Sequence, residues 1–446
     1  MNNRSIDRTP ARQNAGIVIP TIGDASPFHA SRSEETLGLV EALGISNGFL
    51  VELRVREPNA GRLFGGGQLE LIGEQINAQD VTILVVDCAL SPIQQRNLER
   101  VLNVKIVDRT GLILEIFGVR ARSAEGRLQV EMARQLYERS RLVRTWTHLE
   151  RQRGGQGFLA GPGESQLEAD RRMLDRRIAR LKADLENVRR TRRLQRTGRK
   201  RRGKPIIALV GYTNAGKSTL FNRLTSASVL AADMPFATLD PTARDIELPS
   251  GQEVTFIDTV GFITDLPTHL IESFRATIEE AIEADLLLHV RDISHEDSER
   301  QADDVEEILS QLEAKTKIDR PPIIEVWNKS DLLSDSVLEV IKSNATKDND
   351  VTVISSLNGD GIEALLTRIQ SKAFASRRMF QLRLAPQHGK ARAWLHENCE
   401  VDSEEYDDRG ASLISVQLNE IELAKFVHNH PDIDPDDVIL NSSRII

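Results

Sequence analysis

Apolar runs of strand length alternate with amphipathic stretches of helical periodicity along most of this chain. The first alternation extends from Ala15 to about Ala121, with strands expected at 15–19, 49–55, 81–87 and 104–108 and helices near 33–43, 67–78 and 91–102. Strands that alternate with helices form mostly parallel sheets, so this part is expected to be an α/β domain. A second alternation begins with the run IIALVG after Pro205 and continues to about Ala373.

Between these two regions the pattern predicts a helical hairpin. Two long helices, 127–152 and 164–197, are joined by a glycine-rich loop that contains Pro162. In the second helix, apolar residues recur at spacings typical of the seam of an antiparallel coiled coil: Leu167, Leu174, Ile178, Leu181, Leu185 and Val188.

The segment after about Met379 is short and acidic. It has two strand-like runs, LRLAP and ASLISVQL, and one helical run, NEIELAKFV. We therefore predict a multidomain α/β protein. Its parts are an N-terminal α/β domain (15–125), a helical hairpin (126–204), a doubly wound domain with a mostly parallel sheet (205–375) and a small α+β C-terminal domain (376–446).

The composition is that of folded soluble domains. Of the 446 residues, 40% are hydrophobic and 28% are charged, which argues against a disordered or fibrous chain. The two cysteines, Cys88 and Cys399, are too few for a disulfide framework and lack the spacing of a zinc site. No apolar run approaches the roughly 20 residues that span a bilayer, and the N-terminus has no apolar signal core. We expect a cytoplasmic monomer without a membrane span.

Charge is segregated along the chain. The whole chain has 58 Lys and Arg against 67 Asp and Glu, a net charge of −9, whereas residues 164–204 contain 16 basic and 6 acidic residues. Guanidinium groups bind phosphate in a bidentate manner and stack on bases, so RNA contact is the favoured interpretation. A solvated helix face or interdomain ion pairs are the alternative. The basic residues that we assign to this surface and to the run that follows it are Arg171, Arg172, Arg176, Arg177, Arg180, Arg189, Arg190, Arg192, Arg193, Arg199, Lys200, Arg201, Arg202 and Lys204.

The run IIALVGYTNAGKSTLFNRL at 206–224 predicts a strand, a phosphate-binding loop and a helix. Its spacing is GxxxxGK(S/T), in which glycines let the backbone approach a phosphate and N–H groups at a helix N-terminus bind the anion. Lysine reaches the β and γ phosphates, and serine binds Mg²⁺. The loop consists of Gly211, Tyr212, Thr213, Asn214, Ala215, Gly216, Lys217 and Ser218.

Two later strand ends complete a guanine-nucleotide site. VTFIDTVG ends in a DxxG element, whose aspartate orients the Mg²⁺ shell and whose glycine N–H senses the γ-phosphate: Asp258, Thr259, Val260 and Gly261. PIIEVWNKSD ends in Asn328, Lys329, Ser330 and Asp331, and a carboxylate there accepts hydrogen bonds from guanine N1–H and the 2-amino group, which adenine lacks. The run VTVISSL places the backbone of Ser355, Ser356 and Leu357 at the guanine O6.

The segment DMPFATLDPT is expected to be switch I, the loop that closes over Mg²⁺ and the γ-phosphate. Thr238 is the favoured magnesium ligand beside Ser218, and Thr242 is the alternative. The neighbours expected to line the site are Phe236, Ala237, Leu239 and Asp240.

The residue after Gly261 is Phe262, where Ras-like proteins have the glutamine that orients the attacking water. Hydrolysis is therefore expected to be slow unless charge and water positioning come from elsewhere. Asn214 occupies the position at which potassium-using G domains bind K⁺, although it could simply stabilise the loop. The residues expected to act on the reacting phosphate are Lys217, Thr238 and Asn214.

These motifs, together with GGGQLE at 65–70 and GPGESQLEADRRMLDRRI at 161–178, resemble the HflX-type GTPases. The resemblance covers roughly residues 15–375 and is most discriminating in the hairpin segment, where Ser165 stands in place of the family's usual threonine. Both a structural turn and a phosphate or RNA contact remain open for the glycines at 65–67.

The resemblance implies a Ras-like G domain that hydrolyses GTP with Mg²⁺. It also implies binding to the large ribosomal subunit, through rRNA and ribosomal protein, and the splitting or rescue of stalled ribosomes under stress. A ribosome-assembly checkpoint, and an RNA-binding module with GTP as a structural ligand, are the alternatives.

Overall fold

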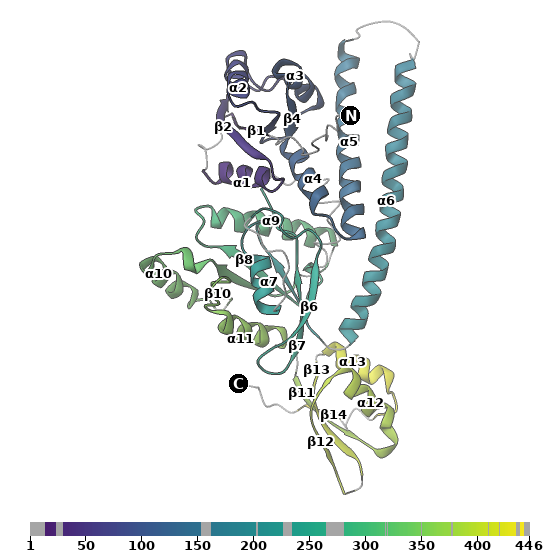
Figure 1. Ribbon diagram of the computed structural model, residues 1–446. Coiled ribbons are helices and arrows are strands. Elements are labelled where there is room, and N and C mark those ends of the chain that lie inside the picture. Colours follow the sequence, from purple (N-terminus) through teal and green to yellow (C-terminus); the bar gives the residue numbers. More distant parts are fainter. Residues whose placement is uncertain are drawn as a thin grey trace, which may run out of the picture.

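Three β-sheets and one long helical hairpin follow one another along the chain (Figure 1). The computed structural model describes residues 14–23, 30–152, 162–201, 204–225, 234–264, 281–316, 318, 320–348, 350–375, 378–408, 410–418, 420–433 and 438–440. Most of the predicted glycine-rich hairpin loop, and the segment that follows Thr264, lie outside these residues. Among the described residues, none of the helices combines the length and apolar character that crossing a membrane requires.

The N-terminal unit, residues 14–120, is a parallel four-stranded sheet of order β2-β1-β3-β4 with four helices. All the predicted strands and helices of this region are present. One further helix, α4, follows the last strand directly. The elements are β1 (Asn14–Ile22), α1 (Ala30–Glu41), β2 (Ser46–Val55), α2 (Gly66–Ala78), β3 (Ile83–Val86), α3 (Pro92–Leu102), β4 (Lys105–Asp108) and α4 (Arg109–Arg120).

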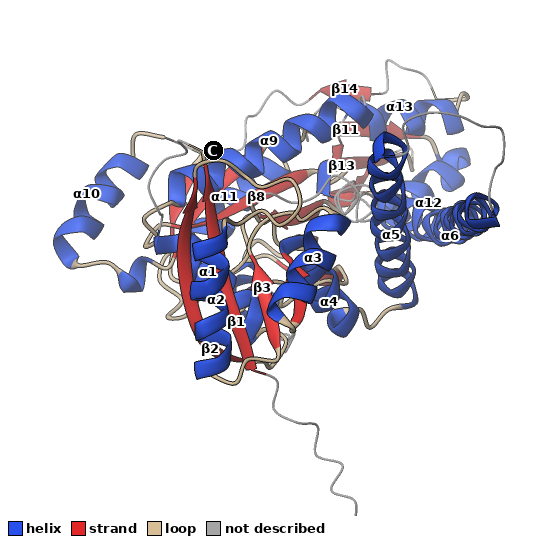
Figure 2. Ribbon diagram, turned by 90° about the horizontal axis from the view of Figure 1, so that it is seen from above, coloured by secondary structure: helices blue, strands red, loops and turns tan. Residues whose placement is uncertain are grey.

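The hairpin consists of α5 (Ala124–Gln152) and α6 (Pro162–Arg201), which lie side by side in both views (Figures 1 and 2). Its apolar seam is as predicted at its centre, because Ile178, Leu181 and Leu185 of α6 are buried against Met132 and Leu136 of α5. The side chain of Leu167 lies outside the described residues.

The central unit, residues 206–373, is a six-stranded sheet of order β10-β9-β8-β5-β7-β6, parallel except for β6. This is the predicted doubly wound sheet, which brings the carboxyl ends of β5, β7 and β9 to one edge. The elements are β5 (Ile206–Val210), α7 (Lys217–Thr225), β6 (Thr242–Glu247), β7 (Glu253–Asp258), β8 (Leu286–Asp292), α9 (Ser298–Thr316), β9 (Ile323–Asn328), α10 (Asp335–Ala345), β10 (Val351–Val353) and α11 (Ile362–Ala373).

The C-terminal unit is a small antiparallel sheet of order β12-β13-β11-β14 with two helices, as the α+β prediction requires. It comprises β11 (Arg378–Leu384), α12 (Gly389–Asn398), β12 (Glu400–Tyr406), β13 (Ser412–Leu418), α13 (Glu420–Asn429) and β14 (Val438–Leu440). Its apolar residues form a core of their own.

The N-terminal and central units, in contrast, share one continuous apolar core. Buried residues of β1, α1 and α4 belong to the same cluster as residues of β5, β7 and the loops at the sheet edge. Among the latter are Tyr212, Phe236 and Phe262, all in or beside predicted nucleotide motifs. The predicted site therefore lies against the N-terminal unit.

Candidate functional site

The loop between β5 and α7 has the backbone of a phosphate-binding loop. Gly211 has φ +149°, and a Cβ there would lie 2.2 Å from the carbonyl oxygen of Val290. Gly216 has φ +91°, and a Cβ there would lie 2.2 Å from Nδ2 of Asn328. Both positions exclude a side chain on two grounds, conformation and space.

Lys217 is the first residue of α7, and its side chain is buried within this loop. Its ammonium Nζ donates a hydrogen bond to the carbonyl of Tyr212 at 2.6 Å. Burial lowers the pKa of Lys217 to about 8, although the nearby carboxylate of Asp258 opposes this effect. A buried ammonium held at a helix N-terminus is the arrangement that an anionic ligand stabilises.

Three side chains with oxygen atoms converge beside Lys217. The hydroxyl of Ser218 lies 2.7 Å from that of Thr238, and both donate to Oδ2 of Asp258 at 2.8 Å. Oδ1 of Asp258 is buried and has no hydrogen-bond partner among the described residues. Burial raises the pKa of Asp258 despite the nearby Lys217. Two hydroxyls and a carboxylate with an unused oxygen fit a hard divalent cation such as Mg²⁺. Of the two threonines predicted for this role, Thr238 is the one whose hydroxyl lies beside Ser218 and Asp258.

The DxxG element closes the other side of the loop. A Cβ on Gly261 would lie 3.0 Å from Nζ of Lys217, so the glycine backbone lies directly against the lysine. Phe262 donates from its backbone N–H to Gly211 O at 3.1 Å and accepts from Thr213 N–H at 2.7 Å. Its side chain is buried in the shared core. Thr259 and Val260 are buried beneath the loop.

The predicted base-binding motifs lie at the end of β9. Asn328 donates from Nδ2 to Ala215 O at 2.8 Å and accepts from the N–H of Ser356 at 2.9 Å, so it joins the phosphate loop to the SSL loop. Ser355 donates to Oδ1 of Asp331 at 2.5 Å. Lys329, at φ +64°, has its ammonium 2.8 Å from Asp292. These contacts bring the motif residues together, with buried Ser330 and exposed Leu357 beside them.

Two predicted site residues make contacts outside the nucleotide motifs. The carboxylate of Asp240 accepts from the backbone N–H groups of Arg122 and Ser123, where the hairpin begins. The hydroxyl of Tyr212 hydrogen-bonds Glu35 of α1 and Thr264 Oγ1. Asn214, at φ +61°, is exposed at the mouth of the loop.

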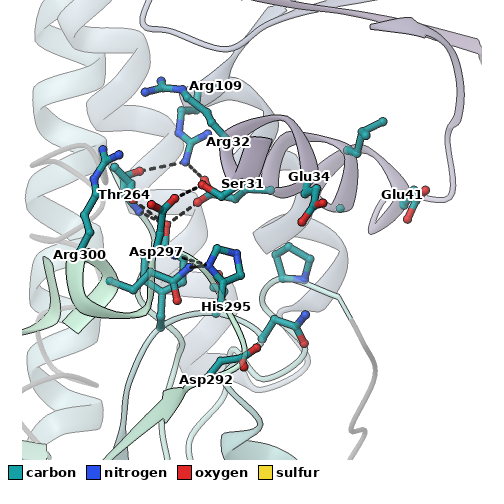
Figure 3. Close-up of a pocket in the computed structure, with 18 residues that line it drawn as sticks. Ser31, Arg32, Glu34, Glu41, Arg109, Thr264, Asp292, His295, Asp297 and Arg300 are labelled. Atoms are coloured by element: carbon teal, nitrogen blue, oxygen red, sulfur yellow. Dashed lines mark hydrogen bonds and ion pairs between the residues drawn. The ribbon is translucent and has the colours of Figure 1, made fainter. Parts of the chain in front are cut away.

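A cleft of about 380 Å³ lies on the N-terminal side of the phosphate loop, between α1, Thr264 and the loop that follows β8 (Figure 3). Its wall carries charges of both signs, including Arg32, Glu34, Asp297 and Arg300. The groove on the nucleotide side is much smaller, about 50 Å³, because Thr238 closes over it.

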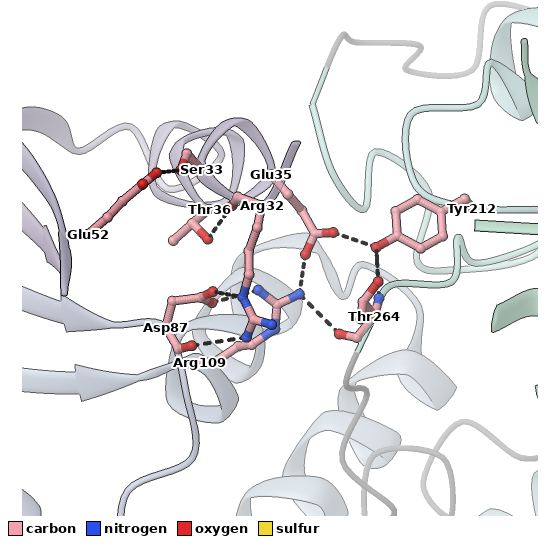
Figure 4. A network of polar contacts seen from close by, with 9 residues as sticks. All are labelled: Arg32, Ser33, Glu35, Thr36, Glu52, Asp87, Arg109, Tyr212 and Thr264. Atoms are coloured by element: carbon pink, nitrogen blue, oxygen red, sulfur yellow. Dashed lines mark hydrogen bonds and ion pairs between the residues drawn. The ribbon is translucent and has the colours of Figure 1, made fainter. Parts of the chain in front are cut away.

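A buried polar network crosses the boundary between the two units beside this cleft (Figure 4). Arg109 pairs with Asp87 at 2.6 Å and with Glu35, and it donates to Thr264 O at 3.0 Å. Arg32 pairs with the same Asp87 at 2.6 Å. Asp87 and Arg109 follow strand ends β3 and β4, where side chains of a parallel sheet gather, and this signal was available in the sequence. The hydrogen bond from Arg109 to Thr264 could not be predicted, because no local pattern pairs residues 155 positions apart.

The predicted arginine surface of α6 is exposed where its side chains are described, at Arg171, Arg172, Arg176, Arg177, Arg180 and Arg190. Two of these have partners within the hairpin: Arg177 pairs with Glu131 at 2.6 Å and Arg172 with Glu168 at 2.6 Å. The glycines at 65–67 begin α2, where Gln68 Oε1 accepts from Gly65 N–H at 3.1 Å, which is a helix cap.

Four family models match consecutive parts of the chain. They are described as GTP-binding GTPase N-terminal (30–118), GTP-binding GTPase Middle Region (120–199), 50S ribosome-binding GTPase (206–329) and HflX C-terminal domain (340–430). The last of these models begins inside the central unit, at α10.

Curated relatives match over most of their length. A GTPase HflX of Magnetococcus marinus is 48% identical over 339 residues, which are 76% of this chain and 77% of that protein. A GTPase HflX of Escherichia coli is 39% identical over 398 residues, 89% of this chain and 92% of that protein. A solved GTP-binding protein from Sulfolobus solfataricus in complex with GDP aligns over 81% of this chain and 98% of its own, with 23% identity and a TM-score of 0.45.

Proposed function

Because this chain belongs to the HflX family of GTPases, we propose that it binds the large ribosomal subunit and uses its GTP cycle to split or rescue stalled ribosomes under stress. Hydrolysis of GTP to GDP and phosphate is its reaction. The ribosomal partner is supported by the match of residues 206–329 to a model described as 50S ribosome-binding GTPase. Such a partner implies action in the cytoplasm, and we propose that the protein acts as a monomer.

In this proposal, the phosphates lie over the backbone of Gly211–Ser218 with Lys217 at the β and γ positions. Ser218 and Thr238 would hold Mg²⁺, with Asp258 orienting its shell, and the ion would neutralise charge on the β and γ oxygens. Asp331 would accept from the guanine N1–H and 2-amino groups, with Ser355, Ser356 and Leu357 at the base edge. The hydrogen bond from Ser355 already fixes the orientation of the Asp331 carboxylate.

At the position where Ras-like proteins have the glutamine that orients the attacking water, this chain has Phe262. Phe262 offers no polar atom in its side chain, and that side chain is buried in the core shared with the N-terminal unit. We propose that the exposed Asn214 binds K⁺, which would add positive charge near the reacting phosphate. We propose that the ribosome supplies the rest by reorganising the switches when it binds.

The observation that carries the ribosome proposal is the exposed arginine face of α6. Arg176 and Arg180 lie on it, beside a shallow groove that also includes Arg177 and Asp184. Arginines on a rigid helix bind successive phosphates of an RNA backbone. Arg177 also pairs with Glu131 of α5, so part of this face joins the two helices of the hairpin.

Sucrose-gradient profiles test the function. Intact ribosomes are incubated with the protein and GTP, GDP or a non-hydrolysable GTP analogue, and the ratio of intact ribosomes to free subunits is measured. We expect GTP and the analogue to lower this ratio and GDP to leave it unchanged. If GTP leaves intact ribosomes in place while the protein sediments with precursor subunits, the checkpoint alternative is correct.

Hydrolysis rates distinguish the third alternative. A ribosome-dependent enzyme should hydrolyse GTP slowly alone and at least about tenfold faster with saturating large subunits, a change of roughly 1.4 kcal/mol in the barrier. An unchanged rate would favour an RNA-binding module in which GTP is a structural ligand.

A further inference from the structure

The segment that contains Thr238 is hydrogen-bonded to the start of the hairpin just after this threonine. Two residues after Thr238, Oδ2 of Asp240 accepts from Arg122 N–H at 2.9 Å and from Ser123 N–H at 2.7 Å. Oδ1 accepts from the hydroxyl of Ser123 at 2.5 Å. The same hydroxyl accepts from Gly126 N–H at 2.8 Å, so Ser123 is the N-cap of α5. A carboxylate at this end of a helix also interacts favourably with the helix dipole.

The segment is also fastened just before Thr238. Phe236, two residues earlier, is buried with its ring edge-to-face on Phe117 of α4, the ring centroids 4.7 Å apart at an interplanar angle of 82°. Its φ of +55° is a conformation that an aromatic residue adopts only when its surroundings enforce it. Thr238 therefore lies between two anchors, and both anchors are outside the central unit.

We propose that Asp240 is a positioning residue for GTP hydrolysis, which together with Ser123 forms a latch that holds Thr238 at Ser218 and Asp258. In a switch held only by Mg²⁺ and the γ-phosphate, loss of that phosphate frees the loop. Here the first turn of the hairpin also holds the loop. Movement of α5 and occupation of the γ-phosphate site are then coupled, and linkage makes the coupling reciprocal. The inference goes beyond the ribosome proposal, since it needs only the isolated protein and its nucleotides.

Gly126 provides a sharp probe of the latch. A Cβ on this residue, the third of α5, would lie 2.2 Å from Oδ1 of Asp240 and 3.2 Å from the Ser123 hydroxyl. Alanine is a better helix former than glycine, and φ at Gly126 is not positive, so Gly126→Ala favours the helix while displacing the carboxylate. Gly73→Ala in α2 is the matched control, because its Cβ would meet only Leu102 Cδ2, at 3.8 Å.

The readout is the ratio of affinities for a fluorescent non-hydrolysable GTP analogue and fluorescent GDP, measured on the full-length chain. Thr238 contributes to binding only when a γ-phosphate is present. We expect Gly126→Ala to raise the Kd for the analogue about tenfold, equivalent to about 1.4 kcal/mol, and to leave the Kd for GDP within about twofold. The turnover number should fall and the Mg²⁺ concentration for half-maximal analogue binding should rise. Gly73→Ala should change none of these.

A charge-rescue pair keeps the proposal falsifiable if Gly126→Ala does not fold. Ser123→Asp retains an N-cap acceptor for α5 but places a second carboxylate against Asp240. Adding Asp240→Asn replaces that repulsion with a donor and an acceptor. The single variant should lose the preference for the GTP analogue, and the double variant should regain at least half of it on a logarithmic scale.

A general loss of stability would weaken the binding of both nucleotides equally. In that case the second substitution would not restore the ratio of affinities for the GTP analogue and GDP. Either result in a folded variant overturns the latch, as does an unchanged affinity ratio in folded Gly126→Ala.

Discussion

Removal of the Arg109 side chain should strongly destabilise the N-terminal unit. This side chain is 4% exposed, and it pairs with the fully buried Asp87 and with Glu35. Arg109→Met keeps most of the apolar volume but leaves two carboxylates without this partner. Removing one member of a buried ion pair costs about 3–5 kcal/mol, and we expect about 3 kcal/mol at pH 7, because Arg32 still pairs with Asp87 at 2.6 Å.

Hydrogen exchange at the backbone amides of β3 measures the loss of stability within the N-terminal unit. Thermal unfolding of the whole multidomain chain does not resolve this local change. A loss of about 3 kcal/mol corresponds to an increase of roughly 150-fold in the exchange rate. Arg134→Met is the control: its pair with Glu115, at 3.3 Å, is exposed on both sides, so we expect at most about 1 kcal/mol, or roughly fivefold. An increase below about fivefold for Arg109→Met would refute the reasoning.

The pH dependence adds a second check. Burial would raise the pKa of Asp87, but Arg109 and Arg32 reverse this, so that its pKa is lowered. The carboxylate therefore stabilises the fold above its unfolded pKa of about 3.9, and this contribution is lost as the pH falls through the lower folded pKa. Without Arg109 the pKa of Asp87 in the folded state is higher, so Asp87 of the variant takes up its proton at a higher pH than in the parent. The difference in free energy of local opening between parent and variant should shrink as the pH is lowered from about 7 to about 4. A constant difference would contradict the role assigned to the Asp87 carboxylate.

Three further predictions concern the nucleotide and RNA surfaces. Asp331→Asn should weaken GTP binding by roughly 2–4 kcal/mol, since two hydrogen bonds to a charged acceptor are lost, and should favour xanthosine triphosphate in competition titrations; equal loss of both nucleotides would count against guanine recognition. Arg176→Glu with Arg180→Glu should weaken binding to large subunits in co-sedimentation and make its salt dependence shallower by about 1.5 units, whereas Lys342→Glu on α10 should not; an unchanged slope would return these arginines to a solvated face. Because burial lowers the pKa of Lys217 to about 8 in the nucleotide-free protein, the Kd for GDP should rise about tenfold between pH 7 and 9 in fluorescence titrations, as the ammonium that binds phosphate is lost; a flat profile would show that its protonation does not control affinity.

The sequence predicted the elements whose hydrophobic pattern is local. The parallel strands, the hairpin seam and the doubly wound sheet all have such a pattern. Helix α4 was missed because seven of its twelve residues, including Thr110 and Arg109, are buried, which removes the amphipathic period. In the C-terminal unit, α12 and the edge strands β12 and β14 were missed. The domain boundaries remain predictions.

In the candidate site, too, local sequence patterns predicted some contacts, whereas contacts between distant parts of the chain were not predicted. Motif spacing placed Lys217, Ser218, Asp258 and Asn328 together, because strand ends of a parallel sheet meet at one edge. It did not indicate that Asp240 contacts Ser123, or that Tyr212 contacts Glu35. These contacts join residues more than a hundred positions apart, and only the packing of two units brings them into contact.

The burial of Phe262 limits how this enzyme could evolve. Considered from the sequence alone, Phe262→Gln would supply an amide that could orient the attacking water. In this fold, however, that side chain is buried in the apolar core that the N-terminal and central units share, to which Phe236 and Tyr212 also belong. An amide there would lose its hydrogen bonds to water and disturb the joint between the units. Mutation toward a self-sufficient GTPase would thus have to rebuild an interface as well as a catalytic group, and a single substitution at this position would not supply both.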